Sequence, residues 1–388
     1  MDSALPYWRL SSFYFAYFAL LGATAPFLSL YFDYLGFSPA RIGELAAIPL
    51  LMRCLSPFVW GWLGDVTGRR LAIVRLGAVC TLFSFALILF DKSFMWLAMV
   101  MALHAFFWHA ILPQFEAITL AHLRDRPTFY SRVRLWGSIG FIVAVVGLGW
   151  LFDWLSLNSF PAAMLVIMLA IVVTAWRVPD AEPVHSGDNT VQLGFGKLLL
   201  KPGVLAFFFC VVLMQASHGP YYTFLTIHLE NLGYARSTIG MIWALGVLAE
   251  IGVFMVMARI LDRFSLRRVL MVSMLLASLR WLLMGYLAQD LWVLLFAQLL
   301  HAASFGCFHS AAVHFVQRSF GIRHLGRGQA AYATVSGMGG ALGALYAGYS
   351  WSALGAGPTF LIASIGAALA AFIIARRLKQ TPHSAPPV

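Results

Sequence analysis

The sequence predicts an all-α integral membrane protein whose twelve transmembrane helices form two six-helix bundles. Three observations predict this fold class. Hydrophobic residues make up 61% of the 388 residues and charged residues only 11%, whereas a soluble domain carries about 25% charged residues. Apolar stretches long enough to cross a bilayer recur along the whole chain. The second half of the chain also repeats a motif of the first half, as shown below.

The apolar stretches divide into six before and six after a polar break at 178–201, which is rich in glycine and proline. We therefore expect an N-terminal six-helix bundle at 1–178, a linker at 179–201, and a C-terminal bundle with a short tail at 202–388. The first stretch is too long for the core of a signal peptide, so it is interpreted as a span. The expected spans are 9–33, 39–63, 71–90, 94–123, 129–154, 159–177, 203–230, 236–261, 269–288, 291–317, 326–350 and 355–376.

The basic residues predict the orientation of the spans. If the N-terminus is cytoplasmic, twenty arginines and lysines fall on the cytoplasmic side and only Arg41, Lys92 and Arg236 on the other. This bias is typical of cytoplasmic loops and places both termini and the linker in the cytoplasm. The net charge of +11 is thus explained by topology, and nucleic acid is not expected as a partner.

Two acid–arginine pairs lie inside the expected spans. Glu116 and Arg134 stand at a similar depth, roughly 10–14 Å from the turn between their helices, and Glu250 and Arg280 lie roughly 17 Å deep. A charge at such depth costs roughly 2.5–3.5 kcal/mol on insertion scales, so these residues usually pair or face a wet cavity and have a function. A purely structural ion pair that ties two helices together is the alternative for each.

Span seven carries a polar and aromatic cluster around Gly219–Pro220. A Gly-Pro pair frees backbone groups, which is tolerated where protein or water satisfies them, so we expect this break to face a cavity. The side chains suit an amphipathic ring substrate, and a gating kink with interfacial tyrosines is an equal alternative. The candidate substrate residues here are Gln215, His218, Tyr221 and Tyr222.

Signals for other classes of protein are weak. The chain has no HExxH motif, P-loop or CxxC pair, and its four cysteines all fall inside apolar segments. His104/His109 and His309/His314 are five residues apart and so lie off one helical face. We therefore expect no enzyme activity, no metal site and no cofactor.

A repeated loop carries a family resemblance. GWLGDVTGRR (Gly61–Arg70) follows span two, and ARILDRFSLRR (Ala258–Arg268) follows span eight. The first resembles the signature loop of the major facilitator superfamily, with Val66 where a basic residue is commoner; the second is a degenerate copy. The resemblance implies the major facilitator fold, with a central cavity between two bundles. It also implies that these loops stabilise one conformational state, through gating residues Asp65, Arg69, Arg70, Asp262 and Arg263.

Five further segments resemble the bacterial phenylpropionate permease group, which is related to nucleoside and oligosaccharide proton symporters. They are VRLWGSIG, QASHGPYYTF, WALGVLAEIGVF, LRWLLMG and LLHAASFGCFH, which begin at residues 133, 215, 243, 279 and 299. In the related lactose-type symporters an acid in span four and an arginine in span five hold the substrate. The resemblance therefore implies substrate binding by Glu116 and Arg134, and Trp136 could stack on a ring.

Lactose-type symporters also place an acid in span eight, an arginine in span nine and a histidine in span ten. This implies proton coupling at Glu250, Arg280, His301 and His309. The second acid that follows the histidine in those symporters is missing after both histidines here. Buried core histidines, satisfied by hydrogen bonds, are the alternative for His301 and His309.

The expected function is alternating-access, proton-coupled uptake of a small organic solute, most simply an aromatic carboxylate such as phenylpropionate. A nucleoside or sugar symporter is the main alternative, and a proton-coupled exporter is a weaker one. Drug antiporters of the superfamily usually carry a Gly-Pro motif in span five, where this chain has glycines without proline. We expect a monomer in the bacterial inner membrane, with the bilayer and a small-molecule substrate as its partners.

Overall fold

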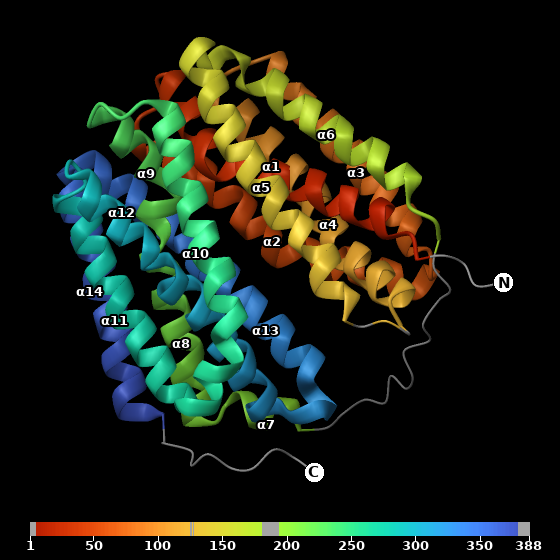
Figure 1. Cartoon of the computed structure of the whole chain (residues 1–388), viewed down its shortest axis with the longest axis vertical. Coiled ribbons are helices and arrows are strands. Elements are labelled where there is room, and N and C mark those ends of the chain that lie inside the picture. The colour runs from red at the N-terminus through yellow and green to blue at the C-terminus, as the bar shows by residue number, and fades with distance from the viewer. Residues whose placement is uncertain (1–4, 125, 127, 181–193, 379–388) are drawn as a thin grey trace. The chain divides into compact units, whose positions relative to one another are not determined.

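The computed structural model describes residues 5–124, 126, 128–180 and 194–378 (Figure 1). Every regular element in these ranges is a helix, as the sequence predicts. The chain divides into two compact units. Unit 1 comprises Met1–Asp188 and Tyr234–Met241, and unit 2 comprises Asn189–Gly233 and Ile242–Val388.

The helices of unit 1 coincide closely with the first six expected spans. A helix of 28 residues such as α1 is about 42 Å long, which is more than the roughly 30 Å of a bilayer's hydrocarbon core. Proline stands at the first helical position of α2 and in the first turn of α6, where its missing N–H costs nothing. The elements are α1 (Tyr7–Tyr34), α2 (Pro39–Thr67), α3 (Arg70–Ala86), η1 (Leu87–Leu89), α4 (Phe94–His122), α5 (Phe129–Trp154), η2 (Leu157–Ser159) and α6 (Phe160–Arg177).

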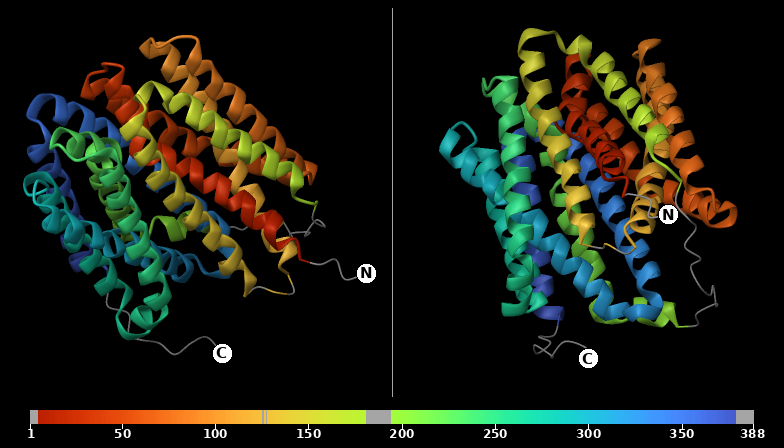
Figure 2. Two further views of the ribbon diagram at one scale, coloured as in Figure 1. Left: turned by 45° about the horizontal axis from the view of Figure 1, so that its top comes forward. Right: turned by 45° about the vertical axis from the view of Figure 1, so that its right-hand side comes forward.

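Helix α1 lies at the centre of unit 1 and packs along α5 and α6, while α4 packs against α2 and α3. Gly140 of α5 permits close contact with α1, because a Cβ atom there would lie only 2.1 Å from the Phe15 carbonyl oxygen. Small residues at helix interfaces are a common feature of membrane bundles. Figure 2 shows α3 and α6 side by side, and these two helices also contact each other.

Unit 2 contains the remaining helices. The seventh span is divided at His218, next to the Gly-Pro pair, and a short helix that the sequence did not predict, α7, precedes it. In Figure 1, α11 and α14 lie side by side, and they pack closely within this unit. The elements are α7 (Phe195–Leu199), α8 (Pro202–Ser217), α9 (Gly219–Asn231), α10 (Arg236–Arg263), α11 (Leu266–Tyr286), α12 (Leu291–Leu299), η3 (Ala302–Cys307), α13 (Phe308–Leu354) and α14 (Ala356–Arg377).

Within the described residues, eleven helices are long and apolar enough to span a membrane. The tenth is Leu291–Gly321, which joins α12, η3 and the start of α13. The expected span 326–350 is also helical and forms the remainder of α13, but it is not one of the eleven. Gly321 has φ 61° and ψ −179°, so a glycine-dependent kink separates the two parts of α13.

The break in span seven is closed by protein. Gly219 packs against α13, where an added Cβ atom would lie 2.2 Å from the Gly343 carbonyl oxygen. On this side of the break the glycine allows α9 and α13 to touch backbone to backbone. That the break also faces a cavity stays a prediction. The neighbouring Tyr222 is exposed, whereas His218 and Tyr221 are buried.

Candidate functional site

The first charged pair lies within unit 1, where α4 supplies Glu116 and α5 supplies Arg134. Arg134 Nε and Glu116 Oε1 are 3.9 Å apart, at the long limit of an ion pair. The two side chains are 32% and 37% exposed, respectively. The structure thus brings the predicted partners together, in loose and accessible contact.

Two aromatic rings of α1 hold the guanidinium of Arg134. Its Cζ atom lies 3.9 Å from the centroid of the Phe18 ring and 5.5 Å from that of Tyr14. Stacking on an aromatic face leaves the planar edge of a guanidinium pointing away from the ring, where it can bind a carboxylate. Sequence reasoning missed both rings, because span one is rich in aromatic residues and nothing distinguishes these two.

Trp136 lies elsewhere. Its indole Nε1 donates to the Tyr7 hydroxyl at 3.1 Å, and its ring packs edge-on against Trp8 at 5.5 Å. The residue thus packs against the first turn of α1, two positions along α5 from Arg134. Its suggested role in stacking on a substrate ring stays a prediction.

The second cluster lies within unit 2 and is buried. Arg280 of α11 is 0% exposed and donates from Nη1 to His301 Nδ1 at 2.9 Å and to Ser304 Oγ at 3.1 Å. Its Nη2 donates to Gln298 Oε1 at 2.8 Å. The guanidinium also stacks over the Tyr221 ring at 4.1 Å. Neutral hydrogen-bond acceptors and a π face therefore surround a fully buried cation.

The hydrogen bond between Arg280 and His301 determines which ring nitrogen of His301 carries the proton. Arginine has only donors, so the Nδ1 atom of His301 must accept, and the ring is neutral with its proton on Nε2. That Nε2 atom lies 3.7 Å from Oε2 of Glu250, whose side chain is 19% exposed. Glu250, His301 and Arg280 thus form a row, with the imidazole between the carboxylate and the guanidinium.

A π-helical segment, η3, shapes this cluster. Short π segments inside α-helices occur often at functional sites, and this one separates α12 from α13 directly after His301. Gly306 of η3 faces Glu250, since a Cβ atom there would lie 3.5 Å from Glu250 Cγ and 2.6 Å from Val253 Cγ1. The glycine therefore allows the two helices to approach next to the carboxylate.

His309 does not contact Arg280 in this arrangement. Its Nδ1 atom lies 3.1 Å from the Tyr332 hydroxyl, and the ring of Phe305 stacks between it and His301, with centroid distances of 5.4 Å and 6.0 Å. The two predicted histidines therefore belong to one column of rings, in which His301 accepts from Arg280. A role of His309 in proton coupling stays a prediction.

Sequence reasoning missed Gln298 and Ser304, which complete the Arg280 cluster. Gln298 is fully buried and is itself held by a hydrogen bond from its Nε2 atom to the Ile242 carbonyl at 2.9 Å. A signal was available: these two residues and His301 are polar positions three residues apart in an otherwise apolar span. Such spacing puts them on one helical face.

The four candidate residues of span seven lie in different places relative to the Arg280 cluster. Tyr221 stacks on both Arg280 and His301. His218 is buried with Nδ1 2.8 Å from the Met214 carbonyl, and its ring stacks on Tyr222 at 5.9 Å. Gln215 lies in the last turn of α8, on the side that faces Gly339 of α13. Binding of a substrate by these residues stays a prediction.

The two signature loops differ. In unit 1, Arg70 donates to Asp65 at 2.6 Å and to Gln114 of α4 at 2.8 Å, which ties the loop to α4. In unit 2, Asp262 lines a cavity of about 530 Å³ together with His314 and Arg318. Arg263 ends α10 beside this cavity, and Arg69 is exposed directly before α3. The gating roles stay predictions.

Among the described residues, no three histidine, cysteine or acidic side chains are grouped so that they could hold a metal ion.

The comparisons with known proteins agree with this architecture. A family model described as the MFS_1 like family matches residues 7–362. The chain is 29% identical over 356 residues to a probable 3-phenylpropionic acid transporter of Escherichia coli, covering 91% of this chain and 93% of that protein. It is 26% identical over 359 residues to a maltose permease of Geobacillus stearothermophilus, covering 91% and 90%. The crystal structure of the nucleoside transporter NupG matches with a TM-score of 0.84 at 18% identity, covering 96% of this chain and 98% of that one.

Proposed function

Because the chain belongs to the MFS_1 like family of the major facilitator superfamily, which consists of membrane transporters and not enzymes, we propose that it takes up a small aromatic carboxylate together with a proton. At the substrate site Arg134 binds the carboxylate of the cargo, and Glu116 is the ion-pair partner that the cargo displaces. Glu250 is the proton acceptor, with Arg280 and His301 controlling its charge. The two bundles alternate access to the site. The basic residues favour cytoplasmic termini and insertion in the bacterial inner membrane.

One observation carries the substrate assignment. Arg134 lies inside a membrane span, its side chain is one-third exposed, and its guanidinium stacks on Phe18. Its contact with the Glu116 carboxylate is long, at 3.9 Å. An incoming carboxylate can bind the guanidinium edge through two parallel hydrogen bonds, which are shorter and stronger than this contact. Phe18, which stacks on the guanidinium, would then lie beside the ring of the cargo. The relative named as a probable 3-phenylpropionic acid transporter supports this class of substrate.

The proton assignment follows from the hydrogen bonds of His301. Protonation at Nδ1 would place a donor against Nη1 of Arg280 and break the bond of 2.9 Å between them. Glu250 can accept a proton while this bond stays intact, because its carboxylate lies on the opposite, Nε2 side of the ring. Glu250 is therefore the group that changes charge during transport, and His301 positions it relative to Arg280.

A substrate panel in proteoliposomes tests the proposal. We expect labelled 3-phenylpropionate to accumulate when an inward proton gradient is applied, and its neutral amide, 3-phenylpropionamide, neither to accumulate nor to compete. Collapse of the gradient with a protonophore should abolish accumulation and leave exchange across the membrane. Accumulation that survives the protonophore would contradict proton coupling, and equal competition by the amide would contradict the role of the carboxylate.

A sugar or nucleoside symporter is the second candidate, because a maltose permease is nearly as similar over the same share of the chain. Including maltose and uridine in the same panel separates the candidates. A neutral cargo has no carboxylate for Arg134, so its transport would leave the ion pair with Glu116 intact. Accumulation of either neutral solute in place of 3-phenylpropionate would establish the second candidate.

A further inference from the structure

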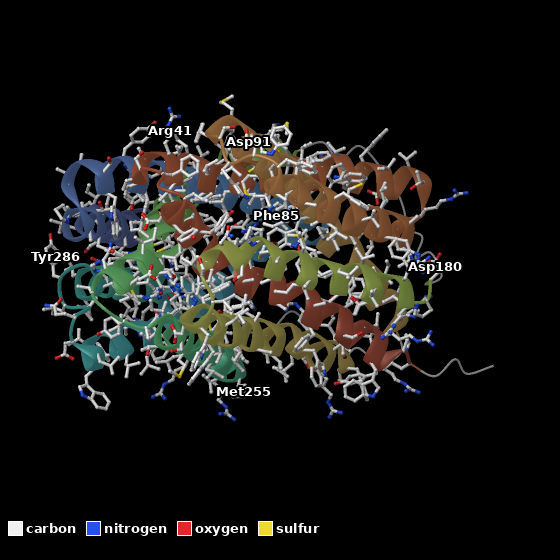
Figure 3. The ribbon with its side chains drawn as sticks, turned by 90° about the horizontal axis from the view of Figure 1, so that it is seen from above. Arg41, Phe85, Asp91, Asp180, Met255 and Tyr286 are labelled. Atoms are coloured by element: carbon white, nitrogen blue, oxygen red, sulfur yellow. The ribbon has the colours of Figure 1, made fainter. Side chains whose placement is uncertain are left out.

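A cavity of about 570 Å³ lies in unit 1 where the start of α3 meets the end of α6. Its lining includes Arg69, Arg75, Leu76, Val79, Trp176 and Asp180. Figure 2 shows the two helices side by side, and Figure 3 labels Asp180, which lies just beyond the end of α6. None of these residues belongs to the substrate or proton site described above.

The lining changes from charged to apolar along the helix axis. Arg69 immediately precedes the first residue of α3, Arg75 lies one and a half turns into it, and Val79 lies about 14 Å from the helix start. Leu76 and Trp176 are half exposed, on helices that span the membrane. Leu71 and Ala72 lie between the two arginines, and beyond Arg75 the part of the lining from α3 is apolar, at Leu76 and Val79. A basic end and an apolar end suit the head group and the acyl chains of a phospholipid.

The guanidinium of Arg75 is already held in place. Its Nε donates to the Ala175 carbonyl at 3.4 Å, and its Nη2 donates to the carbonyls of Trp176 at 3.5 Å and Val178 at 3.2 Å. These are acceptors that the C-terminus of α6 leaves unused. Its Nη1 atom has no hydrogen-bond partner among the described residues, so two preoriented donors remain for a ligand at low entropic cost.

The charge of the cavity favours an anion. Arg69 and Arg75 contribute two positive charges, and the exposed Asp180 contributes one negative charge at the rim. The side chain of Arg69 makes no hydrogen bond with the rest of the described chain, so it is available to a bound group. Basic pockets between membrane helices are suited to lipid head groups, and a free anion would leave the apolar part of the lining without a partner.

We propose that this cavity binds the phosphodiester head group of an anionic phospholipid, with the acyl chains along Leu76 and Val79. Phosphatidylglycerol is the probe, and the predicted orientation puts the site in the cytoplasmic leaflet. Binding of lipid here does not depend on which solute the protein carries.

The test measures lipid retention by the purified full-length transporter. Native mass spectrometry and thermal melting are compared with phosphatidylglycerol, phosphatidylcholine and inorganic phosphate. We expect phosphatidylglycerol to be retained and to raise the melting temperature, and the other two to do neither. Arg69→Gln and Arg75→Gln should each weaken retention about fivefold, since an arginine near a lipid surface contributes about that factor.

Arg132→Gln is the matched control, because it removes an exposed arginine of the same unit that lies outside the cavity. It should change retention less than twofold. Equal losses in all three variants would show a general charge effect and overturn the site. Equal retention of phosphatidylcholine would overturn the role of the phosphate charge, and equal stabilisation by inorganic phosphate would overturn the lipid assignment. If Arg75→Gln destabilises α6, Arg69→Gln alone decides the outcome.

Discussion

Arg134 and Arg280, the arginines of the two charged clusters, are held in different ways. Arg134 in unit 1 is partly exposed, stacks on aromatic rings and lies at 3.9 Å from a carboxylate. Arg280 in unit 2 is completely buried and donates to three neutral side chains. An arginine in loose contact with an acid can exchange that acid for another anion. A buried arginine whose two Nη atoms are bound by neutral groups has no neighbouring acid to exchange, and its charge exerts a fixed field on neighbouring groups.

The largest expected effect concerns the stability of the Arg280 cluster. Arg280→Gln leaves the acceptors of Gln298, His301 and Ser304 buried and unsatisfied, at a cost of about 1–3 kcal/mol for each group. The variant should fail to accumulate as folded protein or should melt far below wild type in detergent. Arg259→Gln, an exposed arginine of α10, should melt like wild type. An equally small loss in both variants would contradict the structural role of Arg280.

The second prediction concerns uphill transport. Glu250→Gln removes the carboxylate 3.7 Å from His301 and cannot change charge, so accumulation driven by a proton gradient should fall at least tenfold. Exchange of labelled for unlabelled substrate should continue, because it needs no net proton movement. Both activities are measured on the same proteoliposomes. Gradient-driven accumulation at the wild-type level would show that the proton binds elsewhere.

The third prediction concerns affinity for the cargo. Arg134→Gln should weaken binding of 3-phenylpropionate about tenfold to a hundredfold, because hydrogen bonds to charged groups contribute about 1.5–3 kcal/mol. Arg134→Lys should retain only part of the affinity, because an ammonium lacks the planar fork. Competition assays measure the affinities, and Arg132→Gln serves as the control for charge. Wild-type affinity in Arg134→Lys would show that two-point binding is not used.

The smallest expected effect concerns Glu116. An exposed ion pair contributes about 0–1 kcal/mol, so Glu116→Gln should change the melting temperature little. It should leave the affinity for 3-phenylpropionate unchanged or raise it by up to about fivefold, because the carboxylate that competes for Arg134 is gone. A large loss of affinity would instead mean that Glu116 binds the cargo directly, as expected for a sugar with hydroxyl groups.

The sequence predicted the positions of the helices well. A long apolar run bounded by charges and turns crosses a bilayer as a helix, because the backbone groups of a helix are all hydrogen-bonded within it. Eleven of the twelve expected spans agree closely with helices or joined helical segments, from α1 to α14. Depth along the helix also predicted that Glu116 would meet Arg134, since residues equally far from a shared turn lie opposite each other. The twelfth expected span, 326–350, is helical too, and the kink at Gly321 separates it from the first part of α13.

The sequence could not predict contacts that depend on how each helix is rotated about its own axis. The direction in which Trp136 points, toward Tyr7, depends on the phase of α5 relative to α1. The π-helical segment η3 shifts that phase in the middle of a span, so the distances of His301 and His309 from Arg280 could not be obtained from regular helical geometry.

The burial of Arg280 has a consequence for how the protein is made. Helix α11 leaves the ribosome before α12, so the arginine reaches the membrane before Gln298, His301 and Ser304 have been synthesised. An unpartnered arginine at the centre of a helix costs roughly 2.5–3.5 kcal/mol during insertion. Insertion without this cost therefore requires that α11 stay outside the bilayer core until the following span has been synthesised. The two helices then enter the bilayer together as a hairpin. Substitutions that remove acceptors from span ten would then reduce the yield of inserted protein, even though they change no residue of α11.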